Sequence, residues 1–265
     1  MLEKREEMEK IFDTHAHYDN PAFDEDREEL IAKLPCYGIG SVVNVGASID
    51  SSKRTLELVR QYPFFYGAVG VHPSETAELT EEGMIFLREA ALQERIVAIG
   101  EIGLDYYWDS PKREIQKQWF IRQLELAREL ALPVIIHSRD AAKDTMEILK
   151  EQKAEEIGGV IHCFSYSAEL AREYLDMGFY LGIGGVLTFS NAKKLKEVVE
   201  MAPLERLVLE TDCPYLAPVP NRGKRNDSLN LSYVAEEIAR IKQVAYQEVA
   251  DITFDNAERL YRLKE

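Results

Sequence analysis

The sequence has little cysteine, only moderate glycine and proline, and no long hydrophobic run. Three cysteines in 265 residues, none in a Cys-x-x-Cys spacing, exclude a disulfide scaffold and predict the reduced thiols of a cytoplasmic protein. Fifteen glycines and ten prolines exclude a collagen-like or low-complexity chain. No stretch approaches eighteen apolar residues, so we expect no membrane-spanning helix. The N-terminal segment MLEKREEMEK carries acidic residues and no apolar core, which argues against a targeting peptide.

Positive charge is also scarce. The chain has 32 Lys and Arg against 47 Asp and Glu, a formal net charge of −15. This balance argues against long-range capture of duplex nucleic acid. It does not exclude an anionic substrate at a locally positive site, because distant charges are screened beyond about 8–10 Å in physiological salt. Hydrophobic residues make up 46% of the chain, which excludes disorder, and no signal for an obligate protein partner is present.

Short apolar, β-branched runs recur along the chain at regular intervals. Most are too continuously apolar to be half-exposed, which is typical of strands buried on both faces in a parallel sheet. The runs are residues 11–15, 41–46, 64–71, 96–102, 133–138, 159–164, 179–185 and 207–212.

Helical patterns alternate with these runs. The clearest covers residues 111–131, where Ser110 can cap the helix and Trp119, Leu126 and Leu130 fall near one stripe. Eight strands alternating with eight helices predict an α/β protein with a closed (β/α)8 TIM barrel, in one domain. The other helical segments are 24–34, 50–62, 80–92, 140–152, 168–177, 191–201 and 232–242, with a final helix over 246–263.

A doubly wound open sheet is the alternative fold. It is less favoured because no Gly-x-Gly-x-x-Gly follows the first run. No linker is visible, so we predict a solvated extension over residues 1–10 followed by a single barrel domain over 11–265.

All five histidines lie at or just past the carboxyl end of a predicted strand. Two carboxylates, Glu101 and Asp212, occupy the same kind of position. In a barrel these strand ends form the one catalytic face, so the seven side chains are expected to converge there. The histidines are His15, His17, His72, His137 and His162.

The His15-Ala-His17 motif predicts a shared metal ion. Residues two apart on a strand face the same way, so both imidazoles can point into one pocket, and Asp13 has the parity to orient a histidine. Glu101 follows an apolar run, where a carboxylate is costly unless it is paired or bound to a cation. It could bridge two metals, and Asp212 could be a ligand or a general base.

Cationic side chains near the same face are candidates for binding a substrate anion. Arg222, Lys224 and Arg225 lie in the long loop over residues 213–231, and Arg139 directly follows a predicted strand. Cys163 and Cys213 adjoin ligand positions but have the opposite parity on their predicted strands, which argues against a nucleophilic role.

Taken together, these motifs resemble the TatD family of metal-dependent deoxyribonucleases and hydrolases, within the amidohydrolase-like barrels. The matching segments follow the family's order from residue 11 to residue 262. They are DTHAHYD (13–19), GVHPS (70–74), GEIGLDYY (100–107), PVIIHSRDA (133–141), HCFS (162–165), ETDCPYLAP (210–218) and RGKRN (222–226).

The resemblance implies a (β/α)8 barrel that binds two divalent ions. It implies that His15 and His17 bind the first ion and that His137 and His162 bind the second. It further implies that Glu101 bridges both ions and that Asp212 completes the first site. His72 is implied to contact substrate or water beside them.

The sequence departs from the family pattern at three places. Ser74 stands where histidine is common, Tyr166 replaces a frequent glycine, and Asp227-Ser228 replaces the usual Glu-Pro. None of these changes removes an implied ligand, so they bear on substrate fit and not on metal chemistry.

We therefore predict a metal-dependent hydrolase that cleaves phosphodiester bonds in DNA, at strand ends or in single strands, by 3′-5′ exonuclease-like action. Asp212, Glu101 and His72 are its predicted catalytic residues. The alternative is an amide or ester hydrolase, which includes D-aminoacyl-tRNA deacylation, and a non-catalytic metal-binding protein is a third class. Imidazole and carboxylate ligands favour Zn, Mn, Fe, Co or Ni, whereas the resemblance implies Mg.

Overall fold

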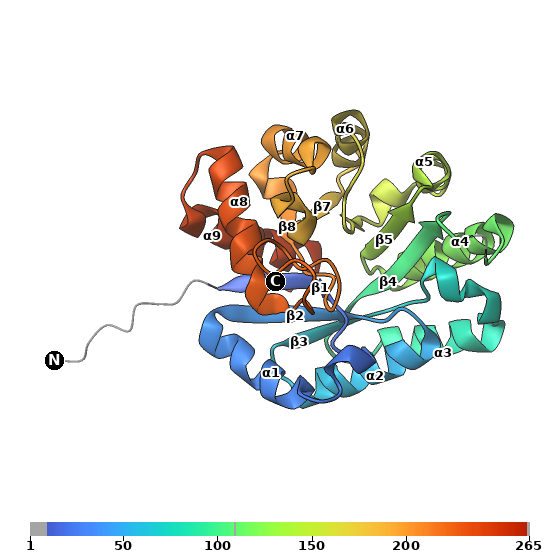
Figure 1. The fold of residues 1–265 in the computed structure, drawn as a ribbon. Coiled ribbons are helices and arrows are strands. Elements are labelled where there is room, and N and C mark those ends of the chain that lie inside the picture. The colour runs from blue at the N-terminus through green and yellow to red at the C-terminus, as the bar shows by residue number, and fades with distance from the viewer. Residues whose placement is uncertain (1–9, 109, 264–265) are drawn as a thin grey trace.

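The computed structural model describes residues 10–108 and 110–263. Its eight strands are all parallel and follow one another in chain order, and they form a nearly closed barrel (Figure 1). This confirms the predicted (β/α)8 fold, and the doubly wound alternative is wrong because that fold needs a reversal of strand order. The strands are β1 (Ile11–Ala16), β2 (Ile39–Val45), β3 (Phe65–Val69), β4 (Ile96–Asp105), β5 (Val134–Arg139), β6 (Gly159–Ile161), β7 (Tyr180–Ile183) and β8 (Leu207–Leu209).

The helices surround the strands on the outside (Figure 1). No helix within the described residues combines the length and hydrophobicity that a bilayer crossing needs. The predicted extension over 1–10 lies outside the described residues except for Lys10, so the predicted division of the chain stays a prediction. The helices are α1 (Arg27–Lys33), α2 (Ile49–Gln61), α3 (Glu81–Ala91), α4 (Arg113–Leu130), α5 (Ala142–Glu151), α6 (Ala168–Asp176), α7 (Lys193–Met201), α8 (Leu231–Lys242) and α9 (Tyr246–Leu260).

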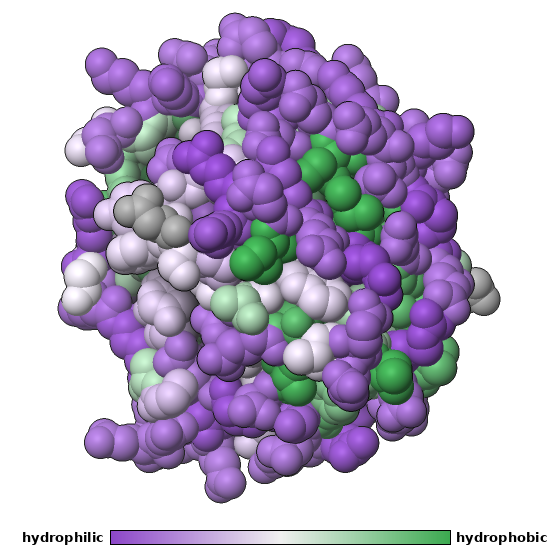
Figure 2. All heavy atoms as spheres, turned by 90° about the vertical axis from the view of Figure 1, so that its right-hand side faces the viewer, coloured by the Kyte–Doolittle hydropathy of each residue, from purple (hydrophilic) through white to green (hydrophobic). Residues whose placement is uncertain are grey.

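The outer surface is mostly polar, as an exposed ring of helices requires. Figure 2 views the side that faces right in Figure 1, where α3, α4 and α5 lie, and shows hydrophilic surface broken by small, separate hydrophobic patches. On α3 and α4, Ile85 and Ile115 are exposed apolar residues. Scattered residues of this kind are normal on a protein surface.

Apolar side chains fill the amino-terminal end of the barrel. Ile135 and Val160 face the same way as His137 and His162, which follow them by two residues on or just after β5 and β6. Both belong to one buried cluster with Tyr261, which follows α9. A packed core at this end leaves the opposite, carboxyl end of the strands for a polar pocket.

The barrel closes where the segment after β8 meets β1. Ala16 and Cys213 form a parallel bridge, and the amide of Asp212 donates to the carbonyl of His15 over 2.9 Å. The hydroxyl of Thr14 donates to the carbonyl of Leu209, the last residue of β8, over 2.9 Å. This seam therefore brings together two predicted metal ligands that are 197 positions apart in the sequence, His15 on β1 and Asp212 just past the end of β8.

Five strands (β2, β3, β6, β7 and β8) end earlier than predicted, and β6 and β8 differ most, by three residues each. β6 stops at Ile161, not at residue 164, and β8 stops at Leu209, not at residue 212. Cys163 and Asp212 have φ angles of 46° and 55°, in the left-handed region, which an extended strand cannot contain. The residues that carry the chemistry therefore sit on sharp turns just past these strands.

Helix α4 buries two glutamines against the strands. The residues of the predicted stripe, Trp119, Leu126 and Leu130, all pack on the hydrophobic core, with Leu126 buried and the other two partly buried. Gln116 and Gln123 are almost fully buried, two helical turns apart. Each side-chain amide accepts a hydrogen bond from the backbone N–H of one buried residue and donates one to the carbonyl of the same residue.

Gln123 fixes the segment that leads from β3 to His72. Its Oε1 accepts from the amide of Val71 over 2.8 Å, and its Nε2 donates to the Val71 carbonyl over 3.1 Å. Gln116 does the same for Asp105 at the end of β4, with two bonds of 2.9 Å. Hydropathy alone does not reveal such residues, since glutamine is normally exposed.

We expect Gln123→Leu to lower the free energy of unfolding by about 2–4 kcal/mol, because it leaves two buried backbone groups without partners. Urea denaturation followed by circular dichroism measures this change. Gln118→Leu, at an exposed position of the same helix, is the control and should shift stability by less than about 0.5 kcal/mol. Equal stabilities of the two variants would contradict the role assigned to Gln123.

Candidate metal centre

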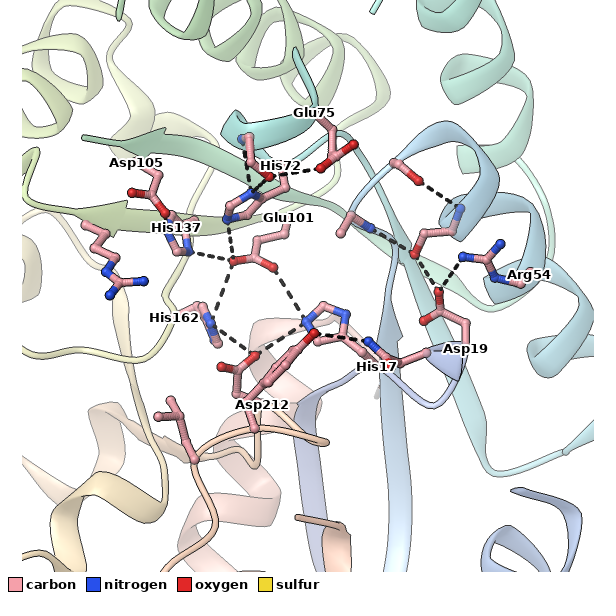
Figure 3. Close-up of a pocket in the computed structure, with 18 of the residues that line it drawn as sticks. His17, Asp19, Arg54, His72, Glu75, Glu101, Asp105, His137, His162 and Asp212 are labelled. Atoms are coloured by element: carbon pink, nitrogen blue, oxygen red, sulfur yellow. Dashed lines mark hydrogen bonds and ion pairs between the residues drawn. The ribbon is translucent and has the colours of Figure 1, made fainter. Parts of the chain in front are cut away.

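A polar pocket opens at the carboxyl end of the strands, with a volume of about 690 Å³. Histidines and carboxylates from six different strand ends, those of β1, β3, β4, β5, β6 and β8, converge in it (Figure 3). The labelled ring consists of His17, His72, Glu101, His137, His162 and Asp212, with Asp105 behind His137 and with Asp19 and Arg54 at one side.

The first group of ligands forms around the His-Ala-His motif. His15 Nε2 and His17 Nε2 lie 3.1 Å apart. Glu101 Oε2 lies 3.4 Å from the former and 3.6 Å from the latter. Asp212 Oδ1 lies 3.9 and 3.4 Å from the same two nitrogens. Two imidazole nitrogens and two carboxylate oxygens therefore surround one point.

The second group lies on the other side of Glu101. Glu101 Oε1 is 2.8 Å from His137 Nδ1 and 3.7 Å from His162 Nε2. Asp105 Oδ2 is 3.3 Å from His137 Nε2, so it contacts the far side of that imidazole. The two oxygens of Glu101 thus face different pairs of histidines.

Hydrogen bonds behind the ring fix which nitrogens face the pocket. His17 Nδ1 lies 2.8 Å from the carbonyl of Val45, and since a carbonyl can only accept, Nδ1 carries the proton. The lone pair of neutral His17 is then at Nε2, where a cation would bind. His162 Nδ1 lies 3.1 Å from Glu210 Oε1, an ion-pair contact, and the Nε2 of this imidazole faces Glu101.

Nearby carboxylates favour the protonated form of two of the buried imidazoles, those of His162 and His17. Burial alone lowers the pKa of His162, but Glu210 and Glu101 outweigh this effect and raise it to about 10. Burial also lowers the pKa of His17, but the carboxylates of Asp212 and Glu101 outweigh this effect and raise it to about 9. A divalent cation can replace these protons as the positive charge that balances the carboxylates.

The chemistry of this donor set fits a divalent cation. Within the described residues, one cluster of possible ligands is His15, His17 and Asp212, and another is Glu101, His137 and His162. The donor atoms in each cluster lie within 4.8 Å of one another. The structure brings all six predicted ligands together, and coordination by these particular residues stays a prediction.

His72 lies at the edge of the ring as a hydrogen-bond donor. Its Nδ1 accepts from the backbone amide of Ser74 over 3.2 Å, so the neutral imidazole carries its proton at Nε2. Nε2 is 3.8 Å from Glu101 Oε1. Burial and the neighbouring His137 lower the pKa of His72 to about 3, which keeps the ring neutral.

Asp13 holds backbone and not an imidazole, so its predicted role beside a histidine ring is wrong. It is fully buried and accepts from the amide of His15 over 3.3 Å and from the hydroxyls of Thr211 and Ser228 over 2.7 and 2.6 Å. A register shift in β1 after Asp13 breaks the simple alternation that the prediction assumed. Ser228, one of the departures from the family pattern, is therefore part of the support of β1.

The side-chain direction of Cys163 also differs from the one that strand alternation predicts. Because β6 ends at Ile161, the thiol points toward the ring, with its sulfur within 4.8 Å of donor atoms of His162 and Asp212. The alternation of side chains along a strand, from which we predicted that the thiol faces away from the ligands, does not apply beyond the end of the strand. Burial raises the pKa of the thiol well above its usual range, so it stays protonated.

The structure does not bring the three loop cations into the pocket. Arg222 lies over the ring of Phe189, and Lys224 donates to Asn221. Both terminal nitrogens of Arg225 bind Asp26, over 2.7 and 2.6 Å. The sequence places these residues in the right loop, but contacts within that loop and with neighbouring segments occupy them.

Two other arginines line the pocket. Arg139 was predicted, and Arg54 was missed because it lies on α2 and not at a strand end. Arg54 is 3.5 Å from the buried carboxylate of Asp19. Asp105 was also missed, although it ends the longest strand four residues after Glu101, with the same parity.

A family model for TatD related DNase matches residues 12–262 of the chain. Among curated proteins, the Bacillus subtilis protein named uncharacterized metal-dependent hydrolase YabD is 48% identical, over 96% of this chain and 99% of its own length. A Cronobacter turicensis protein named 3′-5′ ssDNA/RNA exonuclease TatD is 35% identical, over 95% of this chain and 97% of its own.

The fold agrees with a solved structure of the same family. The crystal structure of YJJV, a TatD homologue from Escherichia coli, superposes with a TM-score of 0.90 at 30% identity, covering 96% of this chain and 98% of that one. The resemblance seen in the sequence motifs is thereby confirmed. The chain belongs to the TatD related DNase family, and it is a metal-dependent hydrolase of the TatD type.

Proposed function

We propose that this protein is a two-metal phosphodiesterase that acts as a 3′-5′ exonuclease on single-stranded DNA. The observation that carries this proposal is the position of Glu101, whose two oxygens face different pairs of histidines. A carboxylate placed in this way can be shared by two cations, the arrangement that in-line displacement at phosphorus uses. The relative named as a ssDNA/RNA exonuclease supports the same substrate class.

His15, His17 and Asp212 would hold one ion, His137 and His162 the other, and Glu101 both. The ligand types favour Zn, Mn, Fe, Co or Ni over Mg. When bound, such ions lower the pKa of a coordinated water from about 15.7 to near 7 and offset charge on the phosphate.

Asp212 is the general base in this proposal. Burial raises the pKa of its carboxyl group, but the nearby imidazoles of His17 and His162 outweigh this effect and keep the pKa below its usual value. The carboxylate therefore stays ionised at neutral pH and can orient a water molecule and take its proton. The new oxygen–phosphorus bond forms as the bond to the leaving 3′ oxygen breaks.

His72 and Arg139 would position the substrate. The proton at His72 Nε2 points toward Glu101 and can be donated to a phosphate oxygen. The guanidinium of Arg139 lies in the pocket lining and can pair with the next phosphate. The pocket is lined mostly by segments that follow the strand ends, together with Ser51 and Arg54 of α2, and a pocket at the mouth of a barrel suits a free strand end better than a continuous duplex.

The amide or ester hydrolase, including a D-aminoacyl-tRNA deacylase, is the second candidate. One observation favours it: Arg222, Lys224 and Arg225 do not line the pocket, so its positive side chains are fewer than the sequence suggested. The same ring of ligands could serve attack at a carbonyl carbon.

A substrate panel separates the two candidates. Metal-loaded protein should shorten a single-stranded oligonucleotide from its 3′ end and should act more slowly on duplex DNA, dipeptides and lactones. Asp212→Asn should lower kcat by about 10²–10⁴-fold with an unchanged circular dichroism spectrum, because it removes the general base. Faster turnover of dipeptides or lactones than of DNA would overturn the nuclease proposal.

Metal uptake should depend on Glu101. We expect two ions per chain after loading with Mn²⁺ or Zn²⁺ and gel filtration, measured by plasma mass spectrometry. Free metal at 100 times its Kd should add about 2.7 kcal/mol of stability for each site. Glu101→Gln should lose most of both effects.

The matched control for this experiment is Glu89→Gln, at an exposed position on α3. It should take up metal and gain thermal stability like the wild type. A wild-type protein that holds no ion at saturating metal would contradict the assignment of the centre.

Arg139→Ala should raise KM for single-stranded DNA by about tenfold or more, since a hydrogen bond to a charged group contributes about 1.5–3 kcal/mol. Arg225→Ala should change KM less than twofold, because that guanidinium already binds Asp26. Steady-state kinetics of both variants test this contrast. A larger rise in KM for Arg225→Ala than for Arg139→Ala would contradict the assignment of Arg139 and would favour the loop cations as the substrate-binding residues.

A further inference from the structure

Exposed aromatic side chains gather beside the metal centre. Among the described residues, Tyr107, Trp108 and Tyr215 are each more than half exposed, at 54%, 58% and 54%. Trp108 and Tyr215 line the pocket, and Tyr107 contacts Trp108. Single exposed aromatics are common, but their concentration around one polar pocket points to a ligand with flat apolar faces.

These aromatics form two separate walls. Tyr107 and Trp108 lie in the connection between β4 and α4, and Tyr215 follows β8. In a ring of eight strands in chain order, β4 and β8 are four strands apart, so their ends face each other across the barrel mouth. A ligand that touches both walls must therefore span the pocket.

The first wall is ordered by its contacts. The amide of Tyr107 donates to Asp105 Oδ1 over 2.9 Å, beside the second group of metal ligands. The guanidinium of Arg139 lies 3.9 Å from the centre of the Tyr107 ring. Trp108 meets the same ring edge to face, with centroids 4.7 Å apart. The wall thus combines a cation with π faces.

The second wall is fixed to the first group of ligands. The amide of Tyr215 donates to the carbonyl of Asp212 over 2.9 Å, and its hydroxyl accepts from Asn20 Nδ2 over 3.1 Å. Each wall therefore starts within three residues of a carboxylate of the metal centre. A phosphate held at that centre would have an aromatic ring on either side.

We propose that Trp108 and Tyr215 form a stacking subsite for the nucleobases that flank the scissile phosphate of a single strand. This inference rests on the proposed nuclease function, and it identifies the nucleobases as the part of the substrate that increases affinity for the protein. Aromatic rings next to cations bind single strands without regard to sequence, because every base has a π face. In a duplex those faces are already stacked, so the subsite would select unpaired strand ends.

The experiment compares two ligands that differ only by the base, dAMP and 2-deoxyribose 5-phosphate. Their Kd values for the metal-loaded protein are measured by isothermal titration calorimetry. Stacking contributes about 1–3 kcal/mol per base, so dAMP should bind about 5- to 150-fold more tightly to the wild type. Trp108→Ala or Tyr215→Ala should reduce this ratio at least threefold and leave the Kd of the sugar phosphate unchanged.

Conservative and distant variants provide the controls. Trp108→Phe and Tyr215→Phe keep a ring and should keep most of the ratio. Tyr37→Ala removes a 67% exposed aromatic that does not line the pocket and should leave the ratio unchanged. A wild-type ratio near one would overturn the subsite, as would alanine variants that weaken both ligands equally.

The oligonucleotide assay separates this inference from the proposed function. If the wild type cuts single strands but binds both ligands equally, the nuclease stands and the stacking subsite is wrong. If the base tightens binding through Trp108 and Tyr215 while no nucleic acid is cut, the subsite stands and the nuclease proposal is wrong.

Discussion

The site depends on a buried carboxylate held among imidazoles. Glu101 is 4% exposed, and an isolated carboxylate at such a depth would be strongly destabilising. Four histidine nitrogens lie between 2.8 and 3.7 Å from its two oxygens, so positive charge, whether protons or metal ions, must accompany it. The need to balance the buried charge of Glu101 thus favours the binding of cations at this place.

Residues that do not themselves line the pocket keep this ring in place. Gln116 and Gln123 on α4 bind the backbone next to Asp105 and His72, and the carbonyl of Val45 sets the tautomer of His17. These bonds join the helix layer to the ligand layer. A substitution on the inner face of α4 would therefore shift the positions of Asp105 or His72 without replacing any predicted metal ligand.

Periodicity and strand-end position were enough to predict the barrel and the convergence of its histidines. Parallel strands in chain order have only one face where their carboxyl ends meet, so His15 and His162 could be grouped without coordinates. Side-chain direction past a strand end could not be predicted, as Cys163 shows, because one residue in the left-handed region cancels the alternation. The partner of Arg225 was hidden for another reason: Asp26 lies 199 positions away.

The seam between β1 and the segment after β8 has a consequence for synthesis of the chain. His15 belongs to the first strand to leave the ribosome, whereas Asp212, which hydrogen-bonds to its carbonyl, follows the last. Seven strands can pair in order before this final contact exists, yet the first group of ligands is incomplete until it forms. A nascent or truncated polypeptide that lacks the segment after β8 therefore lacks one member of the His15, His17 and Asp212 cluster, and closure of the barrel is also the step that completes this cluster.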